Sequence, residues 1–426
     1  MTFAGCNGRE GRLGHAMTKK SELLVGLDIG TSKVAVVVGD CADGTLSIVG
    51  AGSAPSEGLR KGVVVNIDAT VHAIEQAVRE AELAAGCEIH SVVTDVGGAH
   101  VKGFNSHGVV AVRNREVDET DVERVLDAAR AVALPADRDI LHVLPQDFVL
   151  DGQDGIRTPV GMSGVRLESR VHIVTTASPS AQNVIKCCER TGLHVIDLVL
   201  EPLAAGEAVL TPEEKELGVA LVDLGAGTTD ILVFHQGALK HTAVLSLGAN
   251  HVTSDIAAGL QTPFRDAEFL KLRSGSALSR NIDSGDTVEV PSVGGRPPRL
   301  LSRRILSEVI EARAEEILTL ARHQIIRSGF DEALGSGVVL TGGGAQLADI
   351  VPLGEQVFQA PVRLGLPLPV DGSGGEGAAL GPAFTAAIGL LQYGAGPRDL
   401  MPVRPDDGRL LGRVRQRLKG WVEAFF

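Results

Sequence analysis

Two stretches that lie far apart in the chain repeat one plan, and this repeat limits the fold more than any other feature. The first is LLVGLDIGTSKVAVVVGD (Leu23–Asp40), and the second is GVALVDLGAGTTDILVFHQG (Gly218–Gly237). In both, a glycine turn separates two apolar runs, a pattern that predicts buried paired strands. The repeat indicates an internal duplication of long period rather than a short solenoid repeat. We therefore expect an α/β protein built from two related halves.

The composition of the two turns suits phosphate binding. Asp28-Ile-Gly30-Thr31 corresponds to Asp223-Leu-Gly225, and hydroxyl residues follow in each turn. Glycine lets backbone N–H groups approach an anion closely, and threonine or serine hydroxyls add donors. An aspartate at the end of a strand could hold Mg²⁺ through waters, because this ion gives up its hydration shell reluctantly. The alternative is that each stretch is an ordinary tight hairpin of a sheet.

A third glycine turn makes a nucleotide site the better interpretation. In GVVLTGGGAQLADI (Gly337–Ile350) a predicted buried strand leads into Thr341-Gly342-Gly343-Gly344, and a helix is predicted to begin there. Backbone without side chains can approach a ribose or base, and a helix N-terminus favours a nearby phosphate. Three such turns in this order are far more specific than one glycine motif.

In order and spacing, the three turns resemble the two phosphate loops and the adenosine loop of the actin-like ATPases. Within this superfamily the chain resembles the FtsA family of bacterial cell-division proteins, from about Ser21 to Tyr393. The segments that carry this likeness are PVGMSGVRLESRVHIVT (Pro159–Thr175), VTSDIA (Val252–Ala257) and VEVPSVGGRPPR (Val288–Arg299). The resemblance implies an actin-like, ribonuclease H-like duplicated fold with two lobes, a small inserted subdomain and a C-terminal amphipathic helix.

The resemblance also implies which residues contact ATP and magnesium. Asp28 and Asp223 would orient magnesium and its waters. The phosphates would be held from one lobe by Gly30, Thr31, Ser32 and Lys33, and from the other by Gly225, Ala226, Gly227, Thr228 and Thr229. The nucleoside would lie against Gly342, Gly343 and Gly344.

Three further charged residues are candidates with an open alternative. In DAEFLKLRSG, Glu268 and Lys271 match the helix that reaches ribose and base in actin relatives, although a solvated helical face would look the same. Glu201, in LEPLAAGEAVL, resembles the position that supplies the polar side chain orienting the hydrolytic water. A carboxylate within hydrogen-bond reach could act as the base for that water. Alternatively, Glu201 caps a helix in which Pro202 takes the first position.

The resemblance divides the chain into seven parts. Residues 1–20 are expected to be a disordered extension, so that Met17 could equally be the start. The remaining parts are 21–101 with 178–210 (first large subdomain), 102–177 (inserted unit for polymer and partner contacts), 218–247 with 337–393 (second large subdomain), 248–336 (small subdomain), 394–408 (flexible linker) and 409–426 (membrane-targeting helix). The stretch DETDVERVLDAARAVAL predicts a helix in the inserted unit, and RDILHVLPQDFVL predicts a strand.

A cluster of arginines lies in the small subdomain. SVGGRPPRLLSRR contains Arg296, Arg299, Arg303 and Arg304 in an otherwise acidic protein. Runs of charge are usually solvated surface, but arginine forks pair well with carboxylates. FtsA relatives bind the C-terminal tail of the tubulin-like division protein FtsZ through this subdomain, and the resemblance therefore makes the cluster a candidate for that contact.

The last eighteen or so residues differ in character from the rest of the chain. Whereas the whole chain has a formal net charge of −13, this segment contains five basic residues and one acidic residue. On a helix one face would be apolar and the other basic, the pattern of a helix lying in a membrane interface. The apolar face holds Leu410, Leu411, Val414, Leu418, Trp421, Val422, Phe425 and Phe426, and the basic side chains include Arg413, Arg415, Arg417 and Lys419. The alternative is a helix that docks on its own domain.

Composition argues against several other classes of protein. The acidic balance argues against nucleic-acid binding, and the five cysteines show no metal-binding or disulfide pattern. The resemblance to FtsA, with the pattern of residues 409–426, implies an ATP-binding protein that polymerises into filaments on the cytoplasmic face of an anionic cell membrane, anchors the FtsZ ring and recruits other division proteins. ATP hydrolysis would be weak at most. The alternatives are a rod-shape or pilus-assembly actin, a small-molecule phosphotransferase, and a chaperone ATPase.

Overall fold

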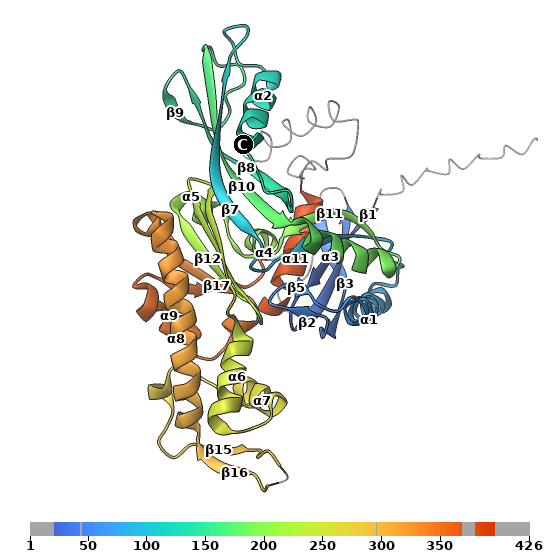
Figure 1. The fold of residues 1–426 in the computed structure, drawn as a ribbon, viewed down its shortest axis with the longest axis vertical. Helices are drawn as coiled ribbons and strands as arrows, with labels where there is room; N and C mark the ends of the chain where they lie inside the picture. Colours follow the sequence, from blue (N-terminus) through green and yellow to red (C-terminus); the bar gives the residue numbers. More distant parts are fainter. Residues whose placement is uncertain (1–20, 43–44, 295, 369–379, 397–426) are drawn as a thin grey trace, which may run out of the picture.

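The computed structural model describes residues 21–42, 45–294, 296–368 and 380–396 of the chain. The molecule is elongated, with two lobes side by side at its centre, a β-rich unit at one end and a mostly helical unit at the other (Figure 1). The predicted N-terminal extension and C-terminal helix, with most of the predicted linker, lie outside the described residues.

The first lobe is built on a five-stranded sheet in the order β11-β6-β1-β2-β3. β1 and β2 are antiparallel, with Ile29 opposite Val34, so the predicted hairpin is present. β1 pairs with β6 in parallel, and α1 (Ile67–Ala85) and α3 (Ser178–Arg190) pack beside each other. The strands are β1 (Ser21–Ile29), β2 (Lys33–Ala42), β3 (Thr45–Pro55), β6 (Ser91–Val96) and β11 (His194–Leu200). A two-stranded ribbon, β4 (Leu59–Arg60) and β5 (Val63–Val64), follows β3.

The second lobe repeats this topology, which confirms the predicted duplication. Its sheet has the order β14-β13-β12-β17-β18, with β12 antiparallel to β13 and parallel to β17. Each strand therefore has a counterpart in the first lobe. The strands are β12 (Val219–Leu224), β13 (Thr229–His235), β14 (Ala238–Leu245), β17 (Val338–Thr341) and β18 (Val362–Leu364). α5 (Pro212–Leu217), η2 (Asp331–Ala333) and α9 (Ile350–Phe358) complete the lobe.

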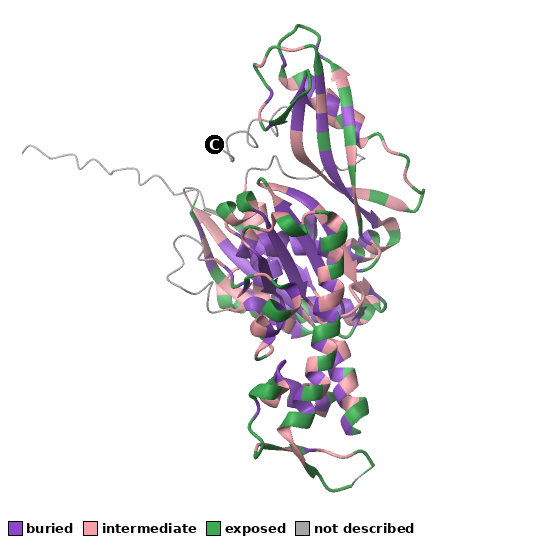
Figure 2. Cartoon of the chain, turned by 90° about the vertical axis from the view of Figure 1, so that its left-hand side faces the viewer, coloured by how far each residue is buried: buried purple, intermediate pink, exposed green. Residues whose placement is uncertain are grey.

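Two helices join the cores of the lobes. α4 (Glu201–Val209) packs against α11 (Thr385–Ala395), and α11 also packs on β1. One continuous apolar cluster runs from Val34–Val38 of the first lobe to Leu221 and Leu232 of the second. Buried residues are concentrated in the sheets of both lobes (Figure 2). α11 ends at Ala395, so the helix extends slightly into the segment predicted to be a linker.

The inserted unit is a small antiparallel sheet with one helix. Its order is β7-β10-β8-β9, and α2 (Glu119–Arg130) packs on it with Asp118 as the N-cap. The strands are β7 (Lys102–Ala111), β8 (Arg138–Leu150), β9 (Gln153–Ile156) and β10 (Arg166–Ala177). The chain leaves the first lobe after β6 and returns to it through α3, yet β7 and β8 also contact β14 of the second lobe.

The small subdomain at the other end consists of α6 (Ala249–Leu260), α7 (Phe264–Ser274), α8 (Arg303–Ser328) and a hairpin, β15 (Thr287–Val290) with β16 (Arg299–Ser302). The short turn η1 (Ser279–Asn281) precedes the hairpin. α8 packs against α6 and α9 and so connects the subdomain to the second lobe. Among the helices of the described residues, none is long and apolar enough to span a lipid bilayer.

Candidate functional site

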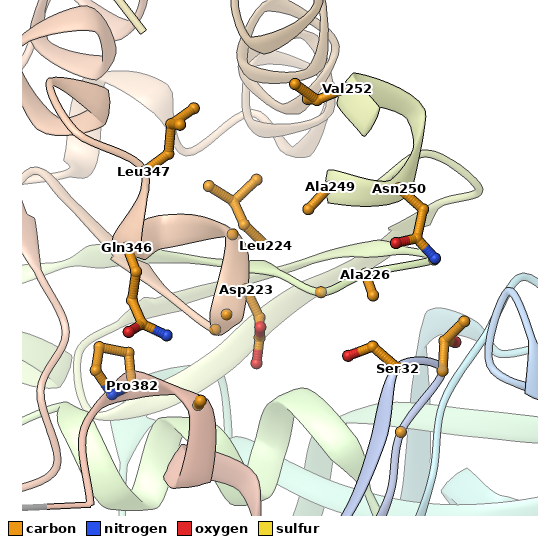
Figure 3. Close-up of a pocket in the computed structure, with 18 of the residues that line it drawn as sticks. Ser32, Asp223, Leu224, Ala226, Ala249, Asn250, Val252, Gln346, Leu347 and Pro382 are labelled. Carbon is orange, nitrogen blue, oxygen red and sulfur yellow. The ribbon is translucent and has the colours of Figure 1, made fainter. Parts of the chain in front are cut away.

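A cavity of about 440 Å³ lies between the lobes, and residues from all three predicted glycine turns line it. The side chains of Ser32 and Asp223 enter it from opposite lobes, with Asn250, Gln346 and Pro382 around the rim (Figure 3). Segments that are far apart in the sequence therefore meet around one space.

The first turn, between β1 and β2, is held by its own backbone. The N–H of Gly30 donates to the carbonyl of Lys33 at 3.0 Å, and a Cβ on Gly30 would lie 2.9 Å from the same oxygen. The hydroxyl of Thr31 accepts a hydrogen bond from the N–H of Gly62 at 3.0 Å. Gly30, Thr31, Ser32 and Lys33 all line the cavity.

The second turn, between β12 and β13, approaches the first turn from the other lobe. A Cβ on Gly227 would lie 2.9 Å from the hydroxyl of Thr31, so only glycine leaves room between the lobes. Gly225, Ala226, Gly227 and Thr228 line the cavity. Thr229 does not. The strand alternation turns its side chain into the lobe, where the hydroxyl donates to the carbonyl of Leu247 at 2.8 Å.

The third turn follows β17 and packs tightly against β12. Gly342 has φ +84°, and a Cβ there would lie 2.2 Å from Oδ1 of Asp223. Gly343 faces open space, and Gly344 packs on the carbonyl of Leu224. The helix predicted after this turn begins as a short 3₁₀ helix, η3 (Gly343–Gln346), and the α-helix α9 begins at Ile350.

Glu268 and Lys271 lie on α7 and line the cavity. Nζ of Lys271 lies 2.7 Å from Oε2 of Glu268 and donates to the hydroxyl of Thr253 at 2.9 Å. Lys271 is 8% exposed, so the alternative of a solvated helical face does not hold for it. The pair presents one fixed carboxylate and one fixed ammonium group to the cavity wall.

Buried carboxylates form the floor of the site. Burial raises the pKa of Asp28 to about 6, opposed by the positive charge of Lys33. Burial and the negative charges of Asp230 and Asp28 raise the pKa of Asp223 to about 8. Oδ1 of Asp28 is buried and has no hydrogen-bond partner among the described residues. Carboxylate oxygens without partners fit a hydrated Mg²⁺ ion, which prefers one or two carboxylates and keeps several waters.

Sequence reasoning missed two buried carboxylates that do not line the cavity but neighbour those that do. Asp230 lies opposite Asp223 in the β12–β13 pair, and Asp95 interacts with Asp28. Both are buried, and burial raises the pKa of Asp230 to about 7 and that of Asp95 well above its usual range. Oδ1 of Asp95 accepts a hydrogen bond from the N–H of Ile29, at the start of the first turn, at 3.2 Å. The Gly97-Gly98 pair, two residues after Asp95, was the available signal, because it is another glycine turn at the end of a buried strand.

Glu201 begins α4 and lines the cavity close to Asp28 and Asp223. α4 has Leu200 as its N-cap and no side-chain cap, so the capping alternative for Glu201 is not observed. Its carboxylate lies against Gly97, where a Cβ would be 2.1 Å from Oε2. Burial and then the charges of the four aspartates raise the pKa of Glu201 well above its usual range.

The structure separates the four arginines of the candidate partner site. Arg303 donates to the carbonyl of Ser274 at 2.8 Å and to Asp286 at 3.2 Å, and it borders the cavity between the lobes. Arg304 pairs with Glu308 at 3.4 Å. Arg299 donates to the carbonyl of Leu260, and Arg296 lies exposed in the loop before β16.

The duplicated sheets with a cavity between them define the class of protein: an actin-like ATPase fold. The solved complex of the type IV pilus proteins PilM and PilN has this fold, with a TM-score of 0.62 and 18% identity, covering 88% of this chain and 99% of that one. MreB5 of Spiroplasma citri, solved bound to ADP, has a TM-score of 0.50 and 12% identity, covering 87% of this chain and 95% of that one.

Sequence comparison identifies the family. Residues 98–175 match the model of the SHS2 domain inserted in FtsA, and residues 220–389 match that of the cell division protein FtsA. The cell division protein FtsA of Pseudomonas aeruginosa is 49% identical, over 96% of this chain and all of that one. That of Escherichia coli K12 is 44% identical, over 88% of this chain and 90% of that one. The chain belongs to the FtsA family of cell division proteins, as the resemblance predicted.

Proposed function

We propose that this cell-division protein binds ATP with magnesium in the cavity between the lobes. The observation that carries the proposal is that residues of all three glycine turns line one cavity together with the carboxylates of Asp28, Asp223 and Glu201. The structure of MreB5 bound to ADP, which has the same fold, supports a nucleotide as the ligand.

Each group has a role in this proposal. The backbone N–H groups and hydroxyls of the first two turns bind phosphate oxygens, as glycine nests do. Nζ of Lys33 is buried 3.7 Å from the ring centroid of Phe384 and has no hydrogen-bond partner within the described part of the chain, and we assign it to a phosphate. Glu268 and Lys271 bind the ribose end, and Asp28 and Asp223 hold the ion. Magnesium neutralises phosphate charge when bound.

Nucleotide binding then acts mainly through conformation. A nucleotide that contacts both lobes stabilises the conformation in which the lobes are closed around it, because it binds that conformation more tightly than the open one. In this proposal Glu201 orients a water toward the phosphates. Burial and the neighbouring aspartates raise the pKa of its carboxyl, and a carboxyl that holds its proton cannot act as the base for that water. We therefore expect slow hydrolysis.

We further propose that the protein forms filaments that tether the FtsZ ring to the cytoplasmic membrane and recruit other division proteins. The membrane contact is assigned to residues 409–426, which lie outside the described residues, from their basic and apolar pattern in the sequence. Each basic residue near an anionic leaflet contributes about 1 kcal/mol. A single helix is thus a reversible anchor, whereas many helices on one filament bind far more tightly.

For the FtsZ tail we propose the exposed surface around β16. In the sequence, Arg296 and Arg304 stand on either side of Leu300 (71% exposed), and Val293 (49% exposed) precedes Arg296. A mixed basic and apolar surface suits a short peptide that carries both carboxylates and apolar side chains. Arg303 is less available, because its guanidinium group already binds Asp286 and Ser274.

The proposal is tested by two measurements on the full chain. Titration calorimetry with Mg·ATP is expected to show binding that Asp223→Asn weakens at least tenfold, an estimate from the loss of one charged ligand. Co-sedimentation with anionic liposomes, with and without an FtsZ tail peptide, compares the full chain with a chain ending at Gly408. Equal membrane binding by both chains contradicts the tether, and absence of the peptide from the full-chain pellet contradicts the adaptor.

A further inference from the structure

The inserted unit reaches into the first lobe at the residue that precedes Glu201. His142, on β8, is buried, and its Nε2 accepts a hydrogen bond from the backbone N–H of Leu200 at 2.9 Å. β11 is an edge strand, paired on one side with β6, and Leu200 is its last residue. The side chain of His142, from the inserted unit, therefore accepts the hydrogen bond of a backbone N–H group at the edge of the first lobe's sheet.

The chemistry of this hydrogen bond defines the state of the imidazole. Because the backbone N–H can only donate, Nε2 must carry a lone pair, and the ring proton is on Nδ1. Burial lowers the pKa of His142 to about 3, so the ring is neutral and keeps its acceptor at physiological pH.

Leu200 determines where Glu201 is held. It is the N-cap of α4, with φ −66° and ψ 123°, and no side chain of the helix itself caps this end. The next residue is Glu201, whose carboxylate is confined between Gly97 and the cavity. A shift of Leu200 would move the Glu201 Cα with it, and a misplacement of about 1 Å can reduce a reaction rate about a hundredfold.

We propose that His142 is a positioning residue, through which the inserted unit holds Glu201 in place for the hydrolytic water. The inference rests on the proposed binding and slow hydrolysis of ATP in the cavity. It makes the hydrolysis rate sensitive to whatever moves β8, including partners that bind the inserted unit. The ring of His142 also meets that of Tyr393 edge-on, with centroids 6.5 Å apart, close to the end of α11.

The experiment compares variants of the full chain. His142→Leu removes the acceptor, and His142→Gln keeps one, because its amide oxygen lies near the place of Nε2. His172→Leu is the matched control. His172 is an equally buried histidine of the same sheet, but it hydrogen-bonds to Thr242 of the second lobe rather than to Leu200. Each variant is assayed for Mg·ATP affinity, kcat and Tm.

We expect His142→Leu to lower kcat about tenfold while ATP affinity stays within about twofold, since only the position of Glu201 changes. His142→Gln should restore kcat to within about threefold of wild type, and His172→Leu should retain it. If His142→Leu does not fold, His142→Asn replaces it, because its shorter amide does not reach Leu200.

The outcomes separate this inference from the proposed function. Failure of the wild-type chain to bind ATP overturns both. ATP binding without turnover above that of Glu201→Gln overturns the inference alone. Equal losses of kcat in His142→Leu and His172→Leu also overturn the inference, because they would show a general effect of removing a buried histidine. Failure of His142→Gln to recover kcat overturns it as well.

Discussion

Single residues decide how closely the loops around the cavity approach one another. Gly342 has a positive φ and lies against the carboxylate of Asp223, whereas its neighbour Gly343 faces open space. Lys271 is a buried lysine on the cavity wall. Asp28 is also buried, and burial raises the pKa of its carboxyl to about 6. Two predictions belong to this scale.

Gly342→Ala should lower the free energy of unfolding by about 2–4 kcal/mol, because it combines a left-handed backbone with a Cβ placed 2.2 Å from Asp223 Oδ1. Gly343→Ala, one residue along, is the matched control and should change stability by less than about 1 kcal/mol. Urea denaturation measures both. Similar losses in the two variants would show that the close contact is unimportant.

The carboxylate floor predicts that stabilisation by Mg²⁺ depends on pH. Asp28 and Asp223 have raised pKa values of about 6 and about 8, so the metal-free folded state binds extra protons and loses stability as pH rises through that range. Mg²⁺ binds the ionised carboxylates and offsets this loss. The rise in Tm caused by MgCl₂ should therefore be larger at pH 8.5 than at pH 6. Asp28→Asn should reduce the rise in Tm caused by MgCl₂. A rise that does not depend on pH would contradict a magnesium site at these carboxylates.

At the scale of elements, two helices unite the lobes through an unusually close contact. A Cβ on Gly389 of α11 would lie 1.7 Å from the carbonyl of Ala204 on α4, and one on Gly26 of β1 would lie 2.2 Å from the carbonyl of Ala387. These glycines let α11 sit directly on its neighbours. The correspondence of β1, β2 and β6 with β12, β13 and β17 shows that the duplication predicted from two short stretches extends through both sheets.

Gly389→Ala should destabilise the protein by about 3 kcal/mol or more, since the backbone of α4 must shift to accept the methyl group. Gly206→Ala, in α4 itself, is the control. Its Cβ would meet only side-chain carbons at 3.5 Å or more, and alanine favours a helix by up to about 1 kcal/mol over glycine. Thermal unfolding should show a lower Tm for Gly389→Ala and a higher Tm for Gly206→Ala. Equal losses of Tm in the two variants would contradict the importance of the close contact between α4 and α11.

At the scale of the whole molecule, the inserted unit bridges the two lobes. His142 binds the first lobe at Leu200, and His172 lies between Asn105 of the insert and Thr242 of the second lobe, at 2.6 and 3.0 Å. Gln146 adds a hydrogen bond to the carbonyl of Leu239 at 2.7 Å. The insert is therefore placed to respond when the lobes move.

Docking of the insert predicts sensitivity to acid. Burial, with a smaller effect of His241, lowers the pKa of His172 to about 4, so stability from this group is lost as pH falls from about 6.5 towards 4. The loss is about 2 kcal/mol at pH 5. His172→Gln, which cannot titrate, should lose less stability than wild type between pH 7 and pH 5. Parallel pH profiles would contradict the prediction.

The membrane tether belongs to the same scale. Trp421→Glu should release the full chain from anionic liposomes, because a charge replaces the largest apolar side chain of the predicted face. Mg·ATP affinity should not change. Arg409→Gln is the control, since one basic residue contributes only about 1 kcal/mol. Retained membrane binding by Trp421→Glu would contradict the predicted orientation of this helix.

The sequence alone determined the local features and the family. Glycine turns, apolar runs and the helix of the insert follow from backbone chemistry within a few residues, so hairpins such as that at Gly30 were predictable, as was the two-lobed duplicated fold. The type of helix after Gly344 was not, because a 3₁₀ turn and an α-helix share the same short-range pattern.

Only the tertiary structure decided which distant groups face each other. It buried Asp95 and Asp230 near the carboxylates of the site, turned the side chain of Thr229 away from the cavity, buried Lys271 and brought His142 to Leu200. The physical reason is that these contacts join residues far apart in the chain. Their energies depend on burial and on partners that only the assembled lobes provide.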